Sequence, residues 1–173
     1  IETKEGKVHV WVHIADVSHY IPKGGNLDVE ASKRATTYYP KEQEPIHMLP
    51  EMLSGDLCSL KPFKDCLAVS VQFIFNPNPD GTCVMEETDP VLSVIHSDHR
   101  LTYEDAEDRI NSDNFYGLDS LTFNLQKLDK IASEIRKARI GNEFYCNDVY
   151  DESKVGTPKA HSLVEEFMIL ANH

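Results

Sequence analysis

Three features that would place a protein in a simple class are missing from this sequence. No apolar run approaches the ~20 residues that a membrane-spanning helix needs, and no signal peptide opens the chain. Cysteines without C-x-x-C spacing are typical of reduced, buried thiols rather than of disulfides or zinc ligands. We therefore expect an intracellular protein, cytoplasmic or nuclear, with no membrane partner. The cysteines are Cys58, Cys66, Cys83 and Cys146.

Basic residues are scarce as well. The chain has 17 Lys and Arg against 29 Asp and Glu, which gives a net charge of -12. A protein that binds nucleic acid over its whole surface is usually basic, because Lys and Arg contact the phosphates. The charge therefore argues against a free-standing RNA-binding module. It argues less against part of a nuclease, whose metal centre requires acids.

The length of 173 residues and the hydrophobic content of 40% allow one domain with a core. Ile1 is not a start residue, and the apolar pattern of the last helix is still running at His173. We therefore expect a slice of a larger protein. No internal repeat or low-complexity segment marks a boundary, so we predict one partial domain over residues 1–173.

Strands dominate the first half of the predicted secondary structure. Residues 8–14 alternate in the way that is typical of a strand with one buried face, and residues 67–75 and 91–96 do the same. Residues 76–81 form a strong turn signal before a return strand that starts at Thr82. With the helices that follow, this order predicts an α+β fold, a mixed or antiparallel sheet with helices packed on it.

Between the first two strands the sequence predicts helical segments and a loop. A helix over residues 27–37 is expected, capped by Asn26. Three prolines make residues 40–50 a loop. A short helical turn over residues 51–54 should end at Gly55.

Three more helices are expected after the strands. Thr102 and Asp105 predict the capping box of the first. The second covers residues 118–139, with leucines on one stripe. The third begins near Pro158 and has Leu163, Phe167 and Leu170 on its inner side.

Histidines raise the separate hypothesis of a metal site. His9 and His13 share a strand face, and His96 and His99 could meet. No cysteine or carboxylate completes either pair at ligand spacing. The other interpretation is that these are surface or hydrogen-bonded histidines.

Several unusual strings occur in a specific order along nearly the whole chain. They are HIADVSHYI from residue 13, Gly-x-Leu-Asp-x-Glu-Ala from residue 25, residues 34–39, MLPEMLSGDLCSL from residue 48, RLTY from residue 100 and VEEFMILAN from residue 164. In this order they resemble the RNB catalytic module of the ribonuclease II and ribonuclease R exoribonucleases. The short, Cys-containing stretch after Phe144 is similar to the RNB segment of large eukaryotic zinc-finger helicases.

The resemblance implies part of a 3'-5' exoribonuclease that hydrolyses single-stranded RNA processively to nucleoside monophosphates with magnesium. In the family, a D-x-x-x-x-x-D-x-D-D-A motif binds the metal, and its place would be ahead of Ile1. A further arginine and glutamate of the family's site would follow His173. Magnesium ligands are therefore expected mostly outside this chain, which should be inactive alone.

Partners implied by the resemblance are single-stranded RNA and other domains of the parent protein, such as RNA-binding modules or a helicase. The alternative is an RNB-like module whose parent has lost catalysis and keeps RNA or protein contacts. The residues before Ile1 would discriminate between the two.

Two aromatic residues match positions at which the family stacks on RNA bases. By its spacing from Arg34, Tyr39 matches the family's tyrosine that stacks on the RNA near its 3' end. Phe144 matches the opposing aromatic residue. Stacking suits sequence-independent degradation, because every base has a π-face. The other interpretation is a core or rim aromatic for Tyr39 and a hydrophobic plug for Phe144.

Three further residues are candidates for contact or support. Tyr103 matches the family's tyrosine that contacts the sugar, and a phenol can bond the 2'-hydroxyl. Glu165 and Glu166 cannot share a helix face, so one carboxylate should point inward and need a partner. We assign Glu165 to RNA binding, against the alternative of a surface glutamate. Asp16, at the exit of the first strand, is a supporting acid or metal ligand.

Overall fold

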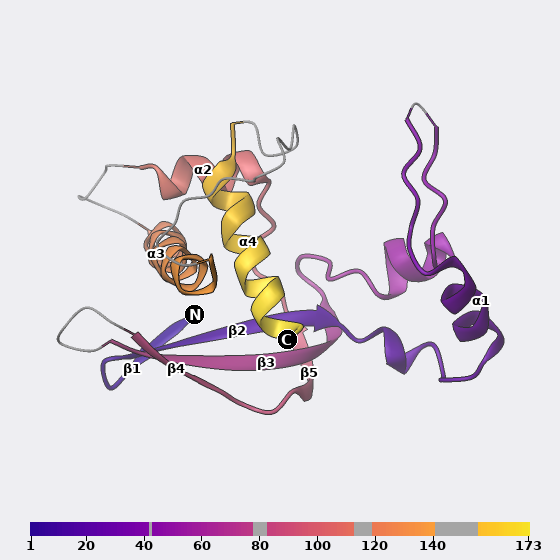
Figure 1. Cartoon of the computed structure of the whole chain (residues 1–173), viewed down its shortest axis with the longest axis horizontal. Helices are drawn as coiled ribbons and strands as arrows, with labels where there is room; N and C mark the ends of the chain where they lie inside the picture. The colour runs from indigo at the N-terminus through magenta and orange to yellow at the C-terminus, as the bar shows by residue number, and fades with distance from the viewer. Residues whose placement is uncertain (42, 78–82, 113–118, 141–155) are drawn as a thin grey trace. The chain divides into compact units, whose positions relative to one another are not determined.

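The computed structural model describes residues 1–41, 43–77, 83–112, 119–140 and 156–173 (Figure 1). It divides into a sheet unit, Glu2–Arg100, and a helix unit, Leu101–His173 together with Ile1. Phe144 and Cys146 lie outside the described residues. Within the described part of the chain, no helix has the length and apolar character needed to cross a membrane.

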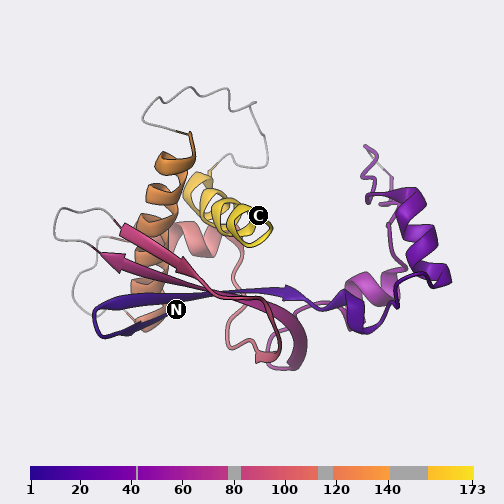
Figure 2. The same ribbon diagram turned by 60° about the horizontal axis from the view of Figure 1, so that its bottom comes forward.

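In the residues that the structure describes, the sheet unit contains five strands, and all of their pairings are antiparallel. Of the two arrangements predicted, a mixed or an antiparallel sheet, the structure has the second. β2 and β3 lie side by side over eight residue pairs, from Val8 opposite Phe75 to Ala15 opposite Ala68 (Figure 2). Phe73 is fully buried, opposite the buried Val10. The predicted alternation is thus confirmed. The strands are β1 (Glu2–Lys4), β2 (Lys7–Ala15), β3 (Asp65–Pro77), β4 (Cys83–Glu87) and β5 (Val91–His96), in the order β1-β2-β3-β4 with β5 also on β3.

A bulge separates β4 from β5 where they run along β3. β4 pairs Glu87 with Phe73, and β5 pairs Val91 with Ser70, so three residues oppose two. Thr88 N–H donates to the Gln72 carbonyl at 3.0 Å. Pro90 has no N–H to give to the ladder, which is why the strand breaks here.

The segment between β2 and β3 differs from the sequence expectation at both helix ends. α1 (Asn26–Arg34) is capped by Gly25, so Asn26 is its first residue and not its cap. The helix ends at Arg34 and not at residue 37, and Ala35, which follows it, has a φ of 62°. The reason is that the following residues are committed to an extended bridge, in which Tyr38 exchanges backbone hydrogen bonds with Ile46 at 3.0 and 2.8 Å.

The predicted short turn over residues 51–54 is also wrong in its extent. A π-helix, η2 (Met52–Leu57), continues through Gly55. Cys58 N–H donates to the Leu53 carbonyl, five residues earlier, at 2.8 Å. This wider turn carries the backbone past the glycine. Cys58 is buried and Cys66 half-buried, and both thiols are free.

The helix unit contains α2 (Tyr103–Ile110), α3 (Ser120–Ile140) and α4 (Pro158–Ala171), which contact one another pairwise (Figures 1 and 2). The capping box is confirmed: Asp105 N–H donates to Thr102 Oγ1 at 3.1 Å, and Thr102 N–H donates to the Asp105 carboxylate at 3.3 Å. Phe167 of α4 is buried as expected, and Leu163 and Leu170 are half-buried.

A buried carboxylate of α2 holds the start of α4. Glu107 is 6% exposed and accepts the Ala160 N–H at 2.8 Å and the Asn111 side-chain amide at 3.1 Å. The first amides of a helix have no partner within the helix, and an acid is favoured at this end. Glu107 therefore caps a helix that begins 51 residues later in the sequence.

Phe73→Ala should lower the free energy of unfolding by about 3–5 kcal/mol, because it empties the centre of the β2–β3 core. Val94→Ala on β5, where the side chain is 66% exposed, is the control and should change it by about 0.5 kcal/mol or less. Urea denaturation measures both. Similar losses in the two variants would contradict this assignment of the core.

The contacts of Asp119 lead us to expect that the free energy of unfolding depends on pH. It accepts the Thr122 N–H at 2.7 Å and Arg109 at 2.9 Å, and these contacts, Thr122 foremost, lower the pKa of its carboxyl from 3.8 to about 2. A carboxyl with a depressed folded-state pKa stabilises the fold above its unfolded pKa, and this contribution is lost as the pH falls.

Asp119→Asn keeps an acceptor for Thr122 but removes the charge. Its stability deficit against the wild type should be constant above about pH 5 and shrink as the pH falls from about 4 to about 2. Urea denaturation at a series of pH values measures it. A deficit that does not change over this window would exclude Asp119 as the source.

Candidate functional site

Tyr39 lies on the sheet unit, on an exposed segment that follows α1. Its side chain is 71% exposed and that of Tyr38 is 61% exposed. The segment is held by the Tyr38–Ile46 bridge and by Arg34, whose guanidinium donates to the His47 carbonyl at 2.9 Å. The structure therefore does not support the interpretation of Tyr39 as a core aromatic. An exposed ring on an anchored backbone can stack on a base.

Asp16 follows β2 and is 7% exposed. Its carboxylate accepts the Ser18 hydroxyl at 2.6 Å and the His19 N–H at 3.1 Å, and so caps the 3-10 helix η1 (Val17–His19). Burial raises the pKa of the Cys58 thiol, and the charge of Asp16 adds to this effect. Asp16 thus shapes the turn that leaves the sheet.

Tyr103 is the first residue of α2 and is 42% exposed. Its ring stacks on the imidazole of His161 in α4, with 3.6 Å between ring centroids and 13° between ring planes. His161 is half-buried, and its Nδ1 lies 2.9 Å from both the carbonyl and the hydroxyl oxygen of Thr157. The reasoning from sequence missed His161, although its spacing of four residues from Glu165 was a usable signal.

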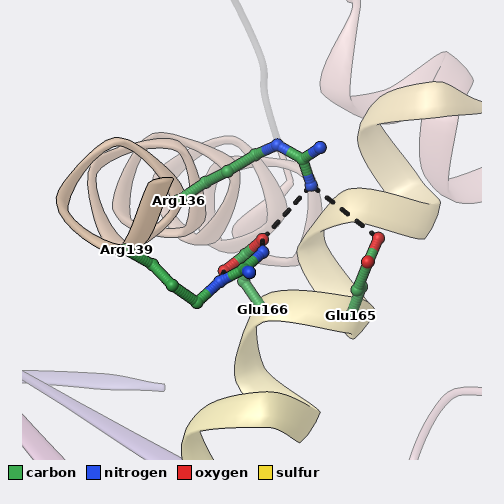
Figure 3. A network of polar contacts seen from close by, with 4 residues as sticks. All are labelled: Arg136, Arg139, Glu165 and Glu166. Carbon is green, nitrogen blue, oxygen red and sulfur yellow. Dashed lines mark hydrogen bonds and ion pairs between the residues drawn. The ribbon is translucent and has the colours of Figure 1, made fainter. Parts of the chain in front are cut away.

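The two glutamates of α4 have different environments (Figure 3). Glu166, not Glu165, is the fully buried one, at 0% side-chain exposure. Arg139 donates to both of its carboxylate oxygens, at 3.0 and 2.6 Å, and Arg136 donates at 3.2 Å. The inward carboxylate is therefore satisfied by α3, and the Glu166 carboxylate raises the pKa of Arg139.

Glu165 stays partly exposed beside this ion pair. Its carboxylate lies 3.8 Å from Arg136, which reaches between the two glutamates in Figure 3. The side chain of Glu165 is 36% exposed. Arg136 and Arg139 were not foreseen from the sequence, although their i, i+3 spacing places them on one face of α3.

In the helix unit, Tyr103 and Glu165 are both neighbours of His161. His161 and Glu165 are four residues apart on α4, so they lie on one face with roughly 5–6 Å between their Cβ atoms. Tyr103 stacks on the first of these two residues. The result is a row of a phenol, an imidazole and a carboxylate. A phenol and a carboxylate can together donate to and accept from a sugar hydroxyl.

Two of the histidines expected as alternative metal ligands, His13 and His96, have other partners. His13 Nδ1 lies 2.6 Å from the Ser70 hydroxyl, and burial lowers the pKa of its imidazole. His96 pairs with Asp65 at 2.8 Å. Among the described residues, no three His, Cys, Asp or Glu side chains are grouped so that they could hold a metal ion.

Comparison with known proteins gives the same family as the sequence strings. A family model for the RNB domain matches residues 1–173, and the chain belongs to the RNB domain family. It is 38% identical to the human exosome complex exonuclease RRP44 over 99% of this chain and 19% of that protein. It is 37% identical to ribonuclease R of Aquifex aeolicus, over 98% of this chain and 26% of that protein. It is 35% identical to the mouse 3'-5' exoribonuclease HELZ2, over 94% of this chain and 6% of that protein. The chain thus spans a small part of these relatives.

Solved structures share the fold. Dss1 exoribonuclease of Candida glabrata, an active-site mutant, matches with a TM-score of 0.81 at 21% identity, over 99% of this chain and 25% of that one. Mycoplasma genitalium RNase R with ribose-methylated single-stranded RNA matches with a TM-score of 0.70 at 24% identity, over 95% of this chain and 27% of that one. Yeast Ssd1, a pseudonuclease, matches with a TM-score of 0.70 at 17% identity, over 96% of this chain and 21% of that one. The α+β prediction is confirmed, and the fold is common to nucleases and a pseudonuclease.

Arg139→Ala should lower the free energy of unfolding by about 1.5–3 kcal/mol, as for hydrogen bonds to charged groups, because it leaves the buried Glu166 with Arg136 alone. Lys137→Ala is the control on the same helix. It removes an exposed pair with Glu134 and should cost about 0.5 kcal/mol or less. Urea denaturation compares them, and equal losses would mean that the buried pair does not stabilise the helix unit.

Proposed function

We propose that this chain is the RNA-contacting part of a longer 3'-5' exoribonuclease, which hydrolyses single-stranded RNA processively to nucleoside monophosphates with magnesium. The observation that carries the proposal is the row of Tyr103, His161 and Glu165 in the helix unit. Two of these three residues were assigned to RNA from the sequence alone. The names of the relatives, exonucleases and exoribonucleases, support the same reaction.

In this proposal the chain contacts RNA by stacking and by sugar recognition. Tyr39 stacks on a base, and Phe144, which lies outside the described residues, stacks from the opposing side. Tyr103 and Glu165 bond the 2'-hydroxyl, the group that distinguishes RNA from DNA. None of these contacts requires a basic surface, which is consistent with the net charge of -12.

Magnesium would be bound mostly by residues outside this chain and would supply charge stabilisation and an activated water. Asp16 supports the end of β2 from a buried position. We further propose that residues 1–173 form one partial RNB domain of an intracellular protein, cytoplasmic or nuclear. Its parent carries other domains, RNA-binding modules or a helicase among them.

A second candidate is a parent that binds RNA without cleaving it. Yeast Ssd1, described as a pseudonuclease, shares the fold with a TM-score of 0.70. The Tyr39 and Tyr103 contacts would serve binding as well as degradation. Aspartates at the family's metal-binding motif favour the enzyme, and substitutions there favour this candidate.

The test uses the full-length parent protein, a 5'-labelled single-stranded RNA and magnesium. Stepwise shortening to a small end product that EDTA abolishes is the expected result. Residues 1–173 alone should release no mononucleotide. RNA binding without cleavage by the parent would replace the exoribonuclease with the second candidate.

Tyr39→Ala in the parent should change the length of the end product, because loss of one stacked base weakens the hold on the RNA by about 1–3 kcal/mol. Tyr38→Ala, at the neighbouring exposed tyrosine, is the matched control and should leave the length unchanged. Gel analysis of the products measures both. An end product of the same length from the wild-type parent, Tyr39→Ala and Tyr38→Ala would contradict the stacking role of Tyr39.

A further inference from the structure

The stack of Tyr103 on His161 joins a residue already assigned to RNA with one that has no assigned role. The rings are nearly parallel, 13° apart, with centroids at 3.6 Å. Tyr103 is the first residue of its helix and is 42% exposed. The imidazole is therefore the surface against which the phenol is oriented.

His161 is itself held in place. Its Nδ1 lies 2.9 Å from the carbonyl oxygen of Thr157, a residue that is 6% exposed. A carbonyl can only accept, so this contact requires the hydrogen on Nδ1. The Thr157 hydroxyl, at the same distance, is turned to the imidazole and does not cap α4. The ring plane of His161 is fixed by a buried neighbour.

The two helices that carry the stacked rings are joined by two further contacts. The buried Glu107 of α2 accepts the Ala160 N–H, and Lys159 donates to the Asn111 side chain at 2.5 Å. Both contacts join the C-terminal half of α2 to the first turn of α4, next to His161. The stack is therefore formed between elements whose relative position is already set.

We propose that His161 is a positioning residue for sugar recognition: it orients the ring of Tyr103 so that the phenol hydroxyl and the Glu165 carboxylate meet the same 2'-hydroxyl. The inference rests on the proposed sugar contact of Tyr103. A ring fixed before binding loses less conformational freedom when RNA arrives, which raises the affinity for RNA over DNA. His161 does not itself touch the RNA.

The experiment measures the affinity of the full-length parent for a single-stranded RNA and for the DNA of the same sequence. Fluorescence anisotropy in EDTA prevents cleavage, so the readout does not depend on catalysis. Tyr103→Phe removes the hydroxyl and should lower the RNA-to-DNA affinity ratio by about 2- to 10-fold, the range for one hydrogen bond.

His161→Ala should lower the ratio by a similar factor, and the double variant should lose no more than Tyr103→Phe alone, because both act on one contact. His161→Phe keeps a flat ring against Tyr103 and should retain the ratio. Thermal unfolding of each variant identifies any loss of folding. If His161→Ala does not fold, His161→Gln takes its place, because glutamine can still donate to the Thr157 carbonyl but has no ring, and it should lower the ratio in the same way.

The outcomes distinguish a failure of the positioning role of His161 from a failure of the proposed sugar contact of Tyr103. A lowered ratio in Tyr103→Phe with an unchanged ratio in folded His161→Ala overturns the positioning role alone. An unchanged ratio in Tyr103→Phe overturns the sugar contact of the proposed function, and this inference with it. A ratio lowered equally in His161→Phe and His161→Ala overturns stacking as the means of positioning.

Discussion

The buried carboxylate of Glu166 is the constraint on which the helix unit depends. Removing an ionised group from water costs several kcal/mol, which is offset only when partners of opposite charge surround it. Arg136 and Arg139 both donate to this carboxylate, and Arg139 does so through two nitrogens. α4 must therefore turn the Glu166 side towards α3. Any rotation about its axis would leave a carboxylate buried without a partner.

This fixed rotation decides what α4 presents on its other faces. Successive residues of a helix are about 100° apart, so Glu165 lies at the edge of the contact with α3 and keeps a partly exposed carboxylate. His161 lies on the same face one turn earlier, against Tyr103. The candidate sugar-contact residues are thus placed by a neighbouring residue that takes no part in the contact.

Tyr39, the proposed stacking residue of the sheet unit, is positioned by different interactions. Tyr39 is exposed, and its backbone is held by the short bridge of Tyr38 with Ile46 and by the hydrogen bond of Arg34 to His47. No buried charge is involved. The proposed RNA contacts are compatible with a net charge of -12, because stacking on bases and hydrogen bonding to sugar hydroxyls need no contact to phosphate.

Four of the five strands in the described residues, the three later helices, the Thr102–Asp105 capping box and the family could be predicted from the sequence, because these follow from local periodicity, capping and characteristic strings. The first strand, β1, was not predicted. α1 ends at Arg34 because the Tyr38–Ile46 bridge follows it, and η2 continues through Gly55 with a hydrogen bond of its own from Cys58 to Leu53. Tertiary structure alone decided which of two adjacent glutamates is buried and which ring lies against Tyr103. Both depend on arginines and a histidine brought near by helix packing, a contact that local sequence pattern does not encode.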